Sequence, residues 1–195
     1  MAEIDVDGSG MFTLEPVQVF CDMEAEGGVG VTVVGHDQED RQRLQGAESA
    51  VGVVINYNIS FEHVTVLVDQ SEYCKQYVSW ECYAALIHNP KENFKATTGW
   101  LDRTGKIADY FGGADPGSKS CACGMTNTCA EEHLKCNCDA NDNVWRKDDG
   151  FLTYKDDLPV YSFVSGDTDG KNEDGYKQIG PLLCHGKDDN PLNNG

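Results

Sequence analysis

The sequence predicts a single, mainly β domain whose polar loops are held by disulfides. Short runs of β-branched and aromatic residues alternate with turns rich in Gly, Asp and Asn along the chain. Five of the nine cysteines fall between Cys121 and Cys138, in a segment without hydrophobic periodicity. The 195 residues suffice for one domain with a hydrophobic core and are few for two.

The β-branched and aromatic runs place the expected strands. These are residues 17–23, 31–34, 51–57, 64–68, 151–155 and 158–164. Residues 58–63 join the third and fourth of these strands. The segments 24–30, 37–49, 89–98 and 166–170 are expected to form turns or loops. No amphipathic helix longer than two turns is expected, and residues 188–195 are expected to be a disordered tail.

The cysteine-rich segment has two interpretations, a disulfide-bonded loop or a zinc site with His133 or His185. Its spacing contains C-x-C pairs and no C-x2-C pair, whereas zinc favours C-x2-4-C turns. Disulfides are therefore the preferred interpretation, and they require an oxidising compartment. The cysteines expected to pair are Cys74, Cys82, Cys121, Cys123, Cys129, Cys136, Cys138 and Cys184.

Two cysteines bracket a short segment and one stands apart. A bridge between Cys74 and Cys82 would close a small loop and contribute about 2–3 kcal/mol. Between them lie Tyr77 and Trp80, and Tyr83 follows. These rings are expected in the core, with a binding face as the alternative. Cys21 is the odd cysteine, which indicates a free thiol, an intermolecular bridge or a partner upstream of residue 1, the last being preferred.

The charge excludes some partners. With 33 acidic and 15 basic residues the formal charge is −18, so nucleic acid and anionic membrane surfaces are repelled. No apolar run is long enough to span a membrane. An extracellular protein or a glycan is the expected partner. Self-association is a further possibility, which this charge disfavours at low salt.

No catalytic motif is present. The sequence lacks G-x-S-x-G, H-E-x-x-H and a phosphate-binding loop. A cysteine nucleophile beside His36, His63, His88 or His133 would need a free thiol, which an oxidising compartment disfavours. Pairs of carboxylates occur in any acidic loop. We therefore predict that the chain is not an enzyme.

Two acidic clusters are candidate calcium sites, because Ca²⁺ takes six to eight oxygen ligands. The first contains Asp139, Asn141, Asn143, Asp148 and Asp149, and the second contains Asp167, Asp169, Asn172, Glu173 and Asp174. The alternative for both is turn formation, since Asp and Asn side chains bond to their own backbone. An EF-hand over residues 1–13 is not expected, because Phe12 stands where glutamate is required.

A family resemblance rests on a set of spaced residues over positions 4–186. The N-terminal part is Phe20-Cys21-Asp22-Met23 before a glycine-rich turn, which resembles fibrinogen-like domains, preceded by Ile4-Asp5-x-Asp7-Gly8. The remainder is similar to the fibrinogen-like module of the contactin-associated proteins of the neurexin superfamily. Its matching residues are Asp69, Ser71, Glu72, Cys74, Cys82, Gly112-Gly113, Cys121-x-Cys123-Gly124, Cys129, Cys136-Asn137-Cys138-Asp139-Ala140, Trp145, Gly150, Leu152, Lys155, Leu158-Pro159-Val160, Asp167-x-Asp169 and Ile179-Gly180-Pro181-Leu182-x-Cys184.

The resemblance implies an α+β fold around an antiparallel sheet, with short helices, in an extracellular recognition module without enzyme activity. It implies one fibrinogen-like domain over residues 1–187, N-terminally truncated, because such modules carry a further cysteine before the opening strand. Some fibrinogen-like relatives bind calcium or acetylated sugars.

Two functions follow from this. The first is an adhesion or matrix module, secreted or in the ectodomain of a cell-surface protein, which binds protein partners or its own copies. The alternative is a calcium-dependent lectin-like domain with aromatic residues stacked on sugar. Asn58-Ile59-Ser60 is an N-glycosylation sequon, which makes Asn58 a candidate attachment site.

Overall fold

A computed structural model describes residues 19–25, 28–44, 46 and 52–186. Its main sheet has the strand order β1-β2-β11-β5-β9, with β3 paired to β11, and every pairing is antiparallel. The strands are β1 (Phe20–Asp22), β2 (Val31–Val34), β3 (Gln42–Leu44), β5 (Tyr73–Tyr83), β9 (Arg146–Leu152) and β11 (Asp174–His185). The prediction is confirmed at the level of a disulfide-rich, mainly antiparallel β domain with few helices.

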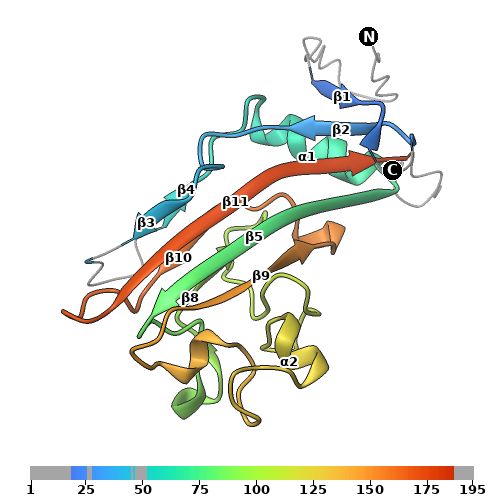
Figure 1. Cartoon of the computed structure of the whole chain (residues 1–195). Helices are drawn as coiled ribbons and strands as arrows, with labels where there is room; N and C mark the ends of the chain where they lie inside the picture. The colour runs from blue at the N-terminus through green and yellow to red at the C-terminus, as the bar shows by residue number, and fades with distance from the viewer. Residues whose placement is uncertain (1–18, 26–27, 45, 47–51, 187–195) are drawn as a thin grey trace.

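The spine of the sheet is the pair of long strands β5 and β11, which lie side by side in Figure 1. Their register runs from Asp174 opposite Tyr83 to His185 opposite Tyr73, with an irregularity between Ile179 and Leu182. At this irregularity the Gly180 carbonyl accepts hydrogen bonds from His36 Nε2 at 2.9 Å and from buried Gln76 Nε2 at 3.1 Å. The break in the ladder is therefore satisfied by side chains.

The two faces of the main sheet differ in burial. Alternate residues of β5 from Cys74 to Cys82 are buried, and their neighbours are partly exposed apart from Ser79. This alternation is the signature of a sheet with one covered and one open face. The covered face packs on a core with Trp80, Trp100, Phe111 and Phe163 as its largest apolar side chains.

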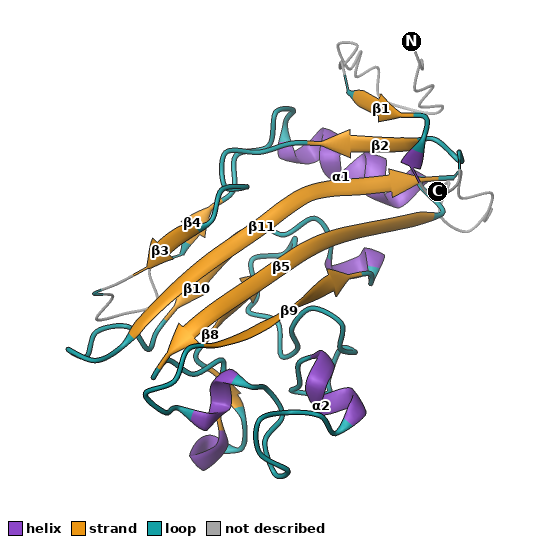
Figure 2. Ribbon diagram, in the orientation of Figure 1, coloured by secondary structure: helices purple, strands orange, loops and turns teal. Residues whose placement is uncertain are grey.

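Two smaller sheets complete the β structure. One contains β4 (Val53–Val54), β10 (Ser162–Ser165) and β8 (Thr98–Leu101), and the other pairs β6 (His88–Asn89) with β7 (Lys95–Ala96). In Figure 2 helix α1 lies behind β2 and β11, and strand β10 lies behind β11. Phe163 of β10 stacks on Trp80 of β5, with ring centroids 5.8 Å apart. The β4-β10-β8 sheet thus helps to cover the inner face of the main sheet.

Helix α1 (Phe61–Gln70) corrects two predictions, the strand at 64–68 and the absence of a helix longer than two turns. Ser60 caps its first turn by accepting a hydrogen bond from the His63 amide at 3.2 Å. Val64 and Val68 lie on one face, four residues apart, and both are fully buried in the core. Tertiary burial and a cap therefore outweigh the β propensity of these valines.

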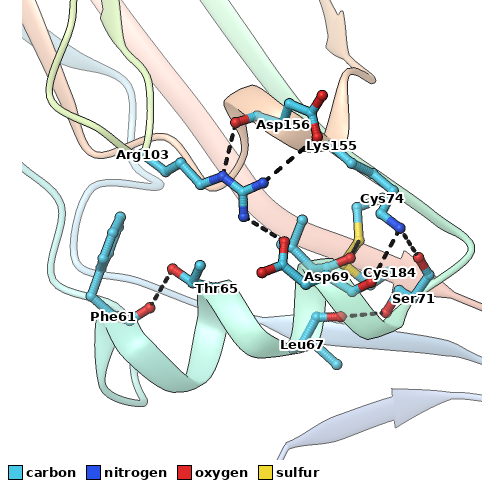
Figure 3. A network of polar contacts seen from close by, with 11 residues as sticks. Phe61, Thr65, Leu67, Asp69, Ser71, Cys74, Arg103, Lys155, Asp156 and Cys184 are labelled. Carbon is cyan, nitrogen blue, oxygen red and sulfur yellow. Dashed lines mark hydrogen bonds and ion pairs between the residues drawn. A yellow bond between two sulfur atoms is a disulfide. The ribbon is translucent and has the colours of Figure 1, made fainter. Parts of the chain in front are cut away.

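Polar contacts hold the C-terminal end of α1, as Figure 3 shows. Arg103 donates to Asp69 Oδ1 at 2.6 Å and to the Asp156 carbonyl at 2.8 Å. The Lys155 ammonium donates to the carbonyls of Asp69 and Ser71, where the free carbonyls of a helix end favour a cation. These contacts join α1 to the 3-10 turn η4 (Lys155–Asp157).

Several predicted boundaries shift. The predicted strand 151–155 is replaced by β9, which begins at Arg146, and the strand 158–164 by β10, which begins only at Ser162. Of the predicted strand 51–57, β4 retains Val53–Val54. The predicted loop 37–49 contains β3, and the predicted link 89–98 contains parts of three short strands and the 3-10 turn η2 (Pro90–Glu92). Charged residues in β9 and β3 hid their strand character, because both strands have an open face.

The remaining helical elements are short. Helix α2 (Ala122–Thr126) and the 3-10 turn η3 (Cys138–Ala140) lie within the cysteine-rich segment. None of the helices in the described ranges is both long and apolar enough to cross a membrane. The EF-hand-like residues 1–13 and the predicted tail 188–195 lie outside the described residues.

Four disulfides use the eight cysteines expected to pair, and the local bridge considered between Cys74 and Cys82 is not among them. Strand β5 holds these two cysteines eight residues apart, about 26 Å along an extended strand. The pairs are Cys74–Cys184, Cys82–Cys138, Cys121–Cys136 and Cys123–Cys129. The zinc alternative is excluded for these sulfurs because each is in a bridge. Cys21 is free and exposed.

Candidate functional site

The open face of the main sheet carries exposed side chains from three strands. The outward residues of β5 are Tyr73, Lys75, Tyr77, Ser79, Glu81 and Tyr83, since their alternates are buried, and of the six only Ser79 is itself buried. Strand register then places Lys147, Asp149 and Phe151 of β9 beside Glu81, Ser79 and Tyr77, and Tyr176 of β11 opposite Glu81 on the other side. We call this surface the outer face.

Three aromatic rings meet at one end of the outer face, and we call them the aromatic cluster. Trp145 lies between Tyr83 and Tyr176, with ring centroids 5.5 Å and 5.7 Å away and planes inclined by 44° and 46°. Trp145 is 50% exposed although it touches both rings. The two ring contacts hold the Trp145 indole in one orientation, with half of its apolar surface exposed to solvent.

Two arginine–carboxylate pairs lie beside the aromatic cluster, and a third holds the chain next to Trp145. Arg41 donates to both Glu81 oxygens at 3.0 and 2.6 Å, and its guanidinium lies 3.5 Å from the centroid of the Tyr176 ring. Arg43 bonds both oxygens of Asp174, with the shortest contact at 2.6 Å. These contacts fix the guanidinium groups and hold the pKa of the Glu81 and Asp174 carboxyls below their usual range.

The third pair joins the loop before β9 to its first residue. Arg146 donates to both oxygens of Asp142, at 2.9 and 2.5 Å, and lowers the pKa of that carboxyl. Because Arg146 directly follows Trp145, this pair also anchors the backbone that presents the indole. The rim of the aromatic cluster is thus polar, with its charges paired.

A second aromatic pair lies further along the outer face. The rings of Tyr77 and Phe151 meet edge to face with centroids 5.6 Å apart, and the Lys75 ammonium lies 4.9 Å from the Phe151 centroid. The Tyr77 hydroxyl donates to Asp149 at 2.5 Å, and Lys147 pairs with the same carboxylate at 2.9 Å. Burial alone would raise the pKa of Asp149, but the Tyr77 hydroxyl and Lys147 hold it below its usual range.

The outer face differs in charge from the chain as a whole. It carries the basic residues Arg41, Arg43, Lys75 and Lys147, and its carboxylates Glu81, Asp149 and Asp174 are each in an ion pair with one of them. Balanced charge and clustered aromatic rings on a chain of charge −18 mark this face as the surface best suited to protein contact.

The first predicted calcium set is divided between different environments. Asp148 is buried, and its oxygens accept the Asn137 amide at 3.0 Å and the Cys138 amide at 2.8 Å. Asp149, the next residue on β9, points to the outer face. Successive strand residues point to opposite faces, so these two carboxylates do not share a site. Asn141 ends η3 in a left-handed conformation, and Asn143 is exposed in the next turn.

Asp139 is a buried carboxyl in η3, next to the disulfide-bonded Cys138, and its pKa is raised. Its Oδ1 accepts the His88 amide at 2.8 Å, while its buried Oδ2 has no hydrogen-bond donor in the part of the chain that the structure describes. Burial is the main cause that raises the pKa of Asp139 to about 7, and burial likewise lowers the pKa of His88 to about 4. Burial also raises the pKa of Asp148, opposed by its backbone donors.

The second predicted calcium set is mostly engaged in turns. Asp167 accepts the Leu86 amide at 2.7 Å, and burial raises its pKa. Glu173 accepts the Gly170 amide at 2.6 Å, and Asp174 is paired with Arg43. Asp169 and Asn172 are exposed. These contacts are the ones expected if the acidic residues stabilise turns rather than bind calcium.

Groups of three potential metal ligands of the His, Cys, Asp and Glu types occur twice in the described ranges. They are His88–Cys136–Asp139 and Cys121–Cys136–Asp148, each with ligand atoms within 4.8 Å of one another. Cys121 and Cys136 are bridged to each other, so neither group offers a thiolate. Calcium binding by the two predicted sets stays a prediction.

The aromatic cluster is the feature that sequence reasoning missed. Of the three rings singled out in and next to the segment between Cys74 and Cys82, Trp80 is fully buried, whereas Tyr77 and Tyr83 face outward. The alternation of residues along β5 indicates that Tyr77 and Tyr83 share a face. The partner rings Trp145 and Tyr176, however, lie 62 and 93 residues from Tyr83 in the sequence. Only the strand register brings them together.

Comparison with known proteins gives one consistent similarity. The chain is 36% identical over 186 residues to contactin-associated protein 1 of Mus musculus, and to the same protein of Rattus norvegicus and Homo sapiens. The match covers 94% of this chain and 13% of each relative, so the chain spans a small part of the proteins it resembles. No protein-family model matches the chain. The identity supports a domain of the contactin-associated protein type.

Proposed function

We propose that this chain is an extracellular recognition module of the contactin-associated protein type, with a fibrinogen-like fold, which binds a protein partner through its outer face. The aromatic cluster is the single observation that carries the proposal. Tryptophan, tyrosine and arginine are the residues enriched in binding hot spots, and here they form one contiguous surface.

The arrangement has the layout of a protein-binding hot spot. Affinity concentrates in apolar side chains that bury fully on binding, inside a polar rim that excludes water. Trp145 is 50% exposed in the free chain and supplies the apolar anchor. The rim consists of the pairs Arg41–Glu81 and Arg43–Asp174, which are already formed before binding. A pre-ordered surface loses less side-chain entropy when it binds.

The scaffold supports an extracellular setting. Disulfides persist in oxidising compartments, and four of them connect β5, β11 and the cysteine-rich segment. A rigid scaffold holds the aromatic cluster in place without requiring a conformational change. The relatives' name, contactin-associated protein 1, supports a protein as the partner class, and a contactin is the first partner to test.

The test is the substitution Trp145→Ala in a binding assay with a contactin ectodomain. Removing the indole is expected to weaken binding by about 2 kcal/mol, roughly 30-fold, because the anchor of the interface is lost. Met125→Ala is the matched control, since Met125 is an exposed apolar residue on α2, outside the outer face. Surface plasmon resonance gives both affinities.

Two results contradict the proposal. Equal affinities of Trp145→Ala, Met125→Ala and the unsubstituted chain would remove the aromatic cluster from the interface. An absence of binding to every contactin would remove that partner. Self-association is tested separately by light scattering at rising concentration, where a monomer at all concentrations leaves only different chains as partners.

A lectin-like function is the second candidate, favoured by the exposure of Trp145 beside fixed arginine and carboxylate groups. An exposed indole offers an apolar surface to a sugar ring, and neighbouring charged groups bond to its hydroxyls. A glycan array with and without a calcium chelator tests this function together with the predicted calcium dependence. A blank array in both conditions would contradict it, and calorimetry with calcium tests the metal alone.

A further inference from the structure

Asn58 lies in the short connection between β4 and α1, and its side chain is exposed. Its backbone N–H donates to the Gly35 carbonyl at 2.9 Å, which fixes this connection against the end of β2. The residue two positions on, Ser60, is the N-cap of α1. The sequon Asn58-Ile59-Ser60 is therefore presented in one defined conformation on the surface.

Asn58 also forms part of the wall of an apolar pocket. The pocket has a volume of 310 Å³, and its lining includes Phe20, Val33, Ile59 and Pro181, with Asn58 and Glu39 as polar members. Phe20 is 68% exposed, so the largest apolar side chain at the pocket is not covered by the described residues. The Asn58 Nδ2 atom lies close to Gly35, another part of the wall: a Cβ at position 35 would be 2.8 Å from it.

We propose that Asn58 carries an N-linked glycan whose first sugar lies over this pocket. The proposal rests on the extracellular setting of the proposed function and on no property of the outer face. The donor is an oligosaccharide activated as a lipid-linked diphosphate. The Asn58 Nδ2 atom forms a bond to C1 of N-acetylglucosamine, the bond from C1 to the diphosphate oxygen breaks, the diphosphate leaves with the electron pair, and an amide proton is released.

The pocket explains why a glycan suits this position. Apolar side chains that face water, as Phe20 does, gain free energy when a ligand covers them. A pyranose ring combines an apolar face with hydroxyls at its edge, so it covers Phe20 and Ile59 while its hydroxyls remain hydrated. The occupant is attached to a residue of the wall itself, which confines it to this surface.

The attachment is tested by secreting the chain from animal cells and measuring intact mass before and after peptide N-glycosidase treatment. A loss of one glycan is expected for the unsubstituted chain and for Ser60→Thr, which keeps both the sequon and a capping hydroxyl. No loss is expected for Asn58→Gln, which leaves the cap intact, or for Ser60→Ala.

A positive control makes a negative result decisive. On the Asn58→Gln background, Lys95→Thr creates a sequon at the exposed residue Asn93. A glycan on Asn93 in this variant, with none on Asn58 in the unsubstituted chain, would overturn the proposal and leave the extracellular assignment standing.

The position of the sugar has its own test. The glycan is trimmed enzymatically to a single N-acetylglucosamine, and nuclear Overhauser contacts are measured between its acetyl methyl group and the Phe20 ring. Contacts are expected for the trimmed chain and lost in Phe20→Ser. A glycan without such contacts would overturn its placement over the pocket.

Discussion

His88 is a buried histidine that the fold keeps neutral. It is 1% exposed, and its ring lies in the core with Nδ1 3.5 Å from Cys136 Sγ. Desolvation disfavours the imidazolium ion, which lowers the pKa of His88 to about 4, while the unfolded chain protonates this ring at its ordinary value. Stability from the neutral ring is therefore present above about pH 6.5 and is lost as the pH falls through 4.

We predict that His88→Asn reduces the loss of stability on acidification. Between about pH 6.5 and 4 the histidine costs the folded chain up to about 3 kcal/mol, and asparagine does not titrate in this range. Urea unfolding at several pH values measures the difference. Parallel profiles of the two proteins would contradict the assignment.

Asp139 changes the free energy of unfolding with pH in the opposite direction to His88. Its pKa is raised to about 7, so its protonated form stabilises the fold at acid pH, and this stability is lost as the pH rises. The comparison of His88→Asn with the unsubstituted chain separates the histidine from this carboxyl, since both proteins retain Asp139.

At the scale of elements, α1 is the element in which local propensity and tertiary structure disagree. Three of its ten residues are valines, and the run 64–68 is typical of a strand. The Ser60 cap, the burial of Val64 and Val68, and the contacts of Arg103 and Lys155 at the other end make the helix the stable form. A short helix depends on such fixed ends.

The cap gives a prediction at this scale. Ser60→Ala is expected to lower the free energy of unfolding by about 1 kcal/mol, and Ser60→Thr by much less, because threonine keeps the capping oxygen. Chemical denaturation of the three proteins on an Asn58→Gln background measures this without a contribution from a glycan. Equal stability of the alanine and threonine variants would mean that the cap is not a stabilising contact.

At the scale of the whole molecule, the disulfides differ in how much chain they close. Cys74–Cys184 joins residues 110 apart and links the ends of β5 and β11, whereas Cys123–Cys129 joins residues 6 apart within one loop. In the chain-entropy model the stabilisation grows with the number of residues enclosed. The long-range bridge therefore holds the main sheet, and the short one holds a local turn.

We predict that replacing Cys74 and Cys184 by serine destabilises the chain by about 5 kcal/mol, and replacing Cys123 and Cys129 by about 2 kcal/mol. Guanidinium unfolding of the two double variants gives the comparison. A larger loss for the short loop would contradict the entropic account. In the unsubstituted folded chain a thiol-reactive dye is expected to label Cys21 alone, because the eight other sulfurs are bridged.

The sequence by itself determined the class of the domain. Its alternating apolar runs indicated β structure, and the spacing of its cysteines favoured disulfides over zinc, because both patterns are local properties of the chain. It also marked Asn58 as a glycosylation candidate. Local patterns failed at residues 64–68 and at β9, where burial on one face decided the secondary structure.

Tertiary structure decided the pairing and the site. Cys74 and Cys82 are close in sequence, but the extended strand between them separates them, while β11 brings Cys184 to Cys74 and η3 brings Cys138 to Cys82. The aromatic cluster arises in the same way, since Tyr83, Trp145 and Tyr176 meet only through the register of β5, β9 and β11. Contacts between residues far apart in the chain depend on how strands pair, and no local pattern of residues specifies that pairing.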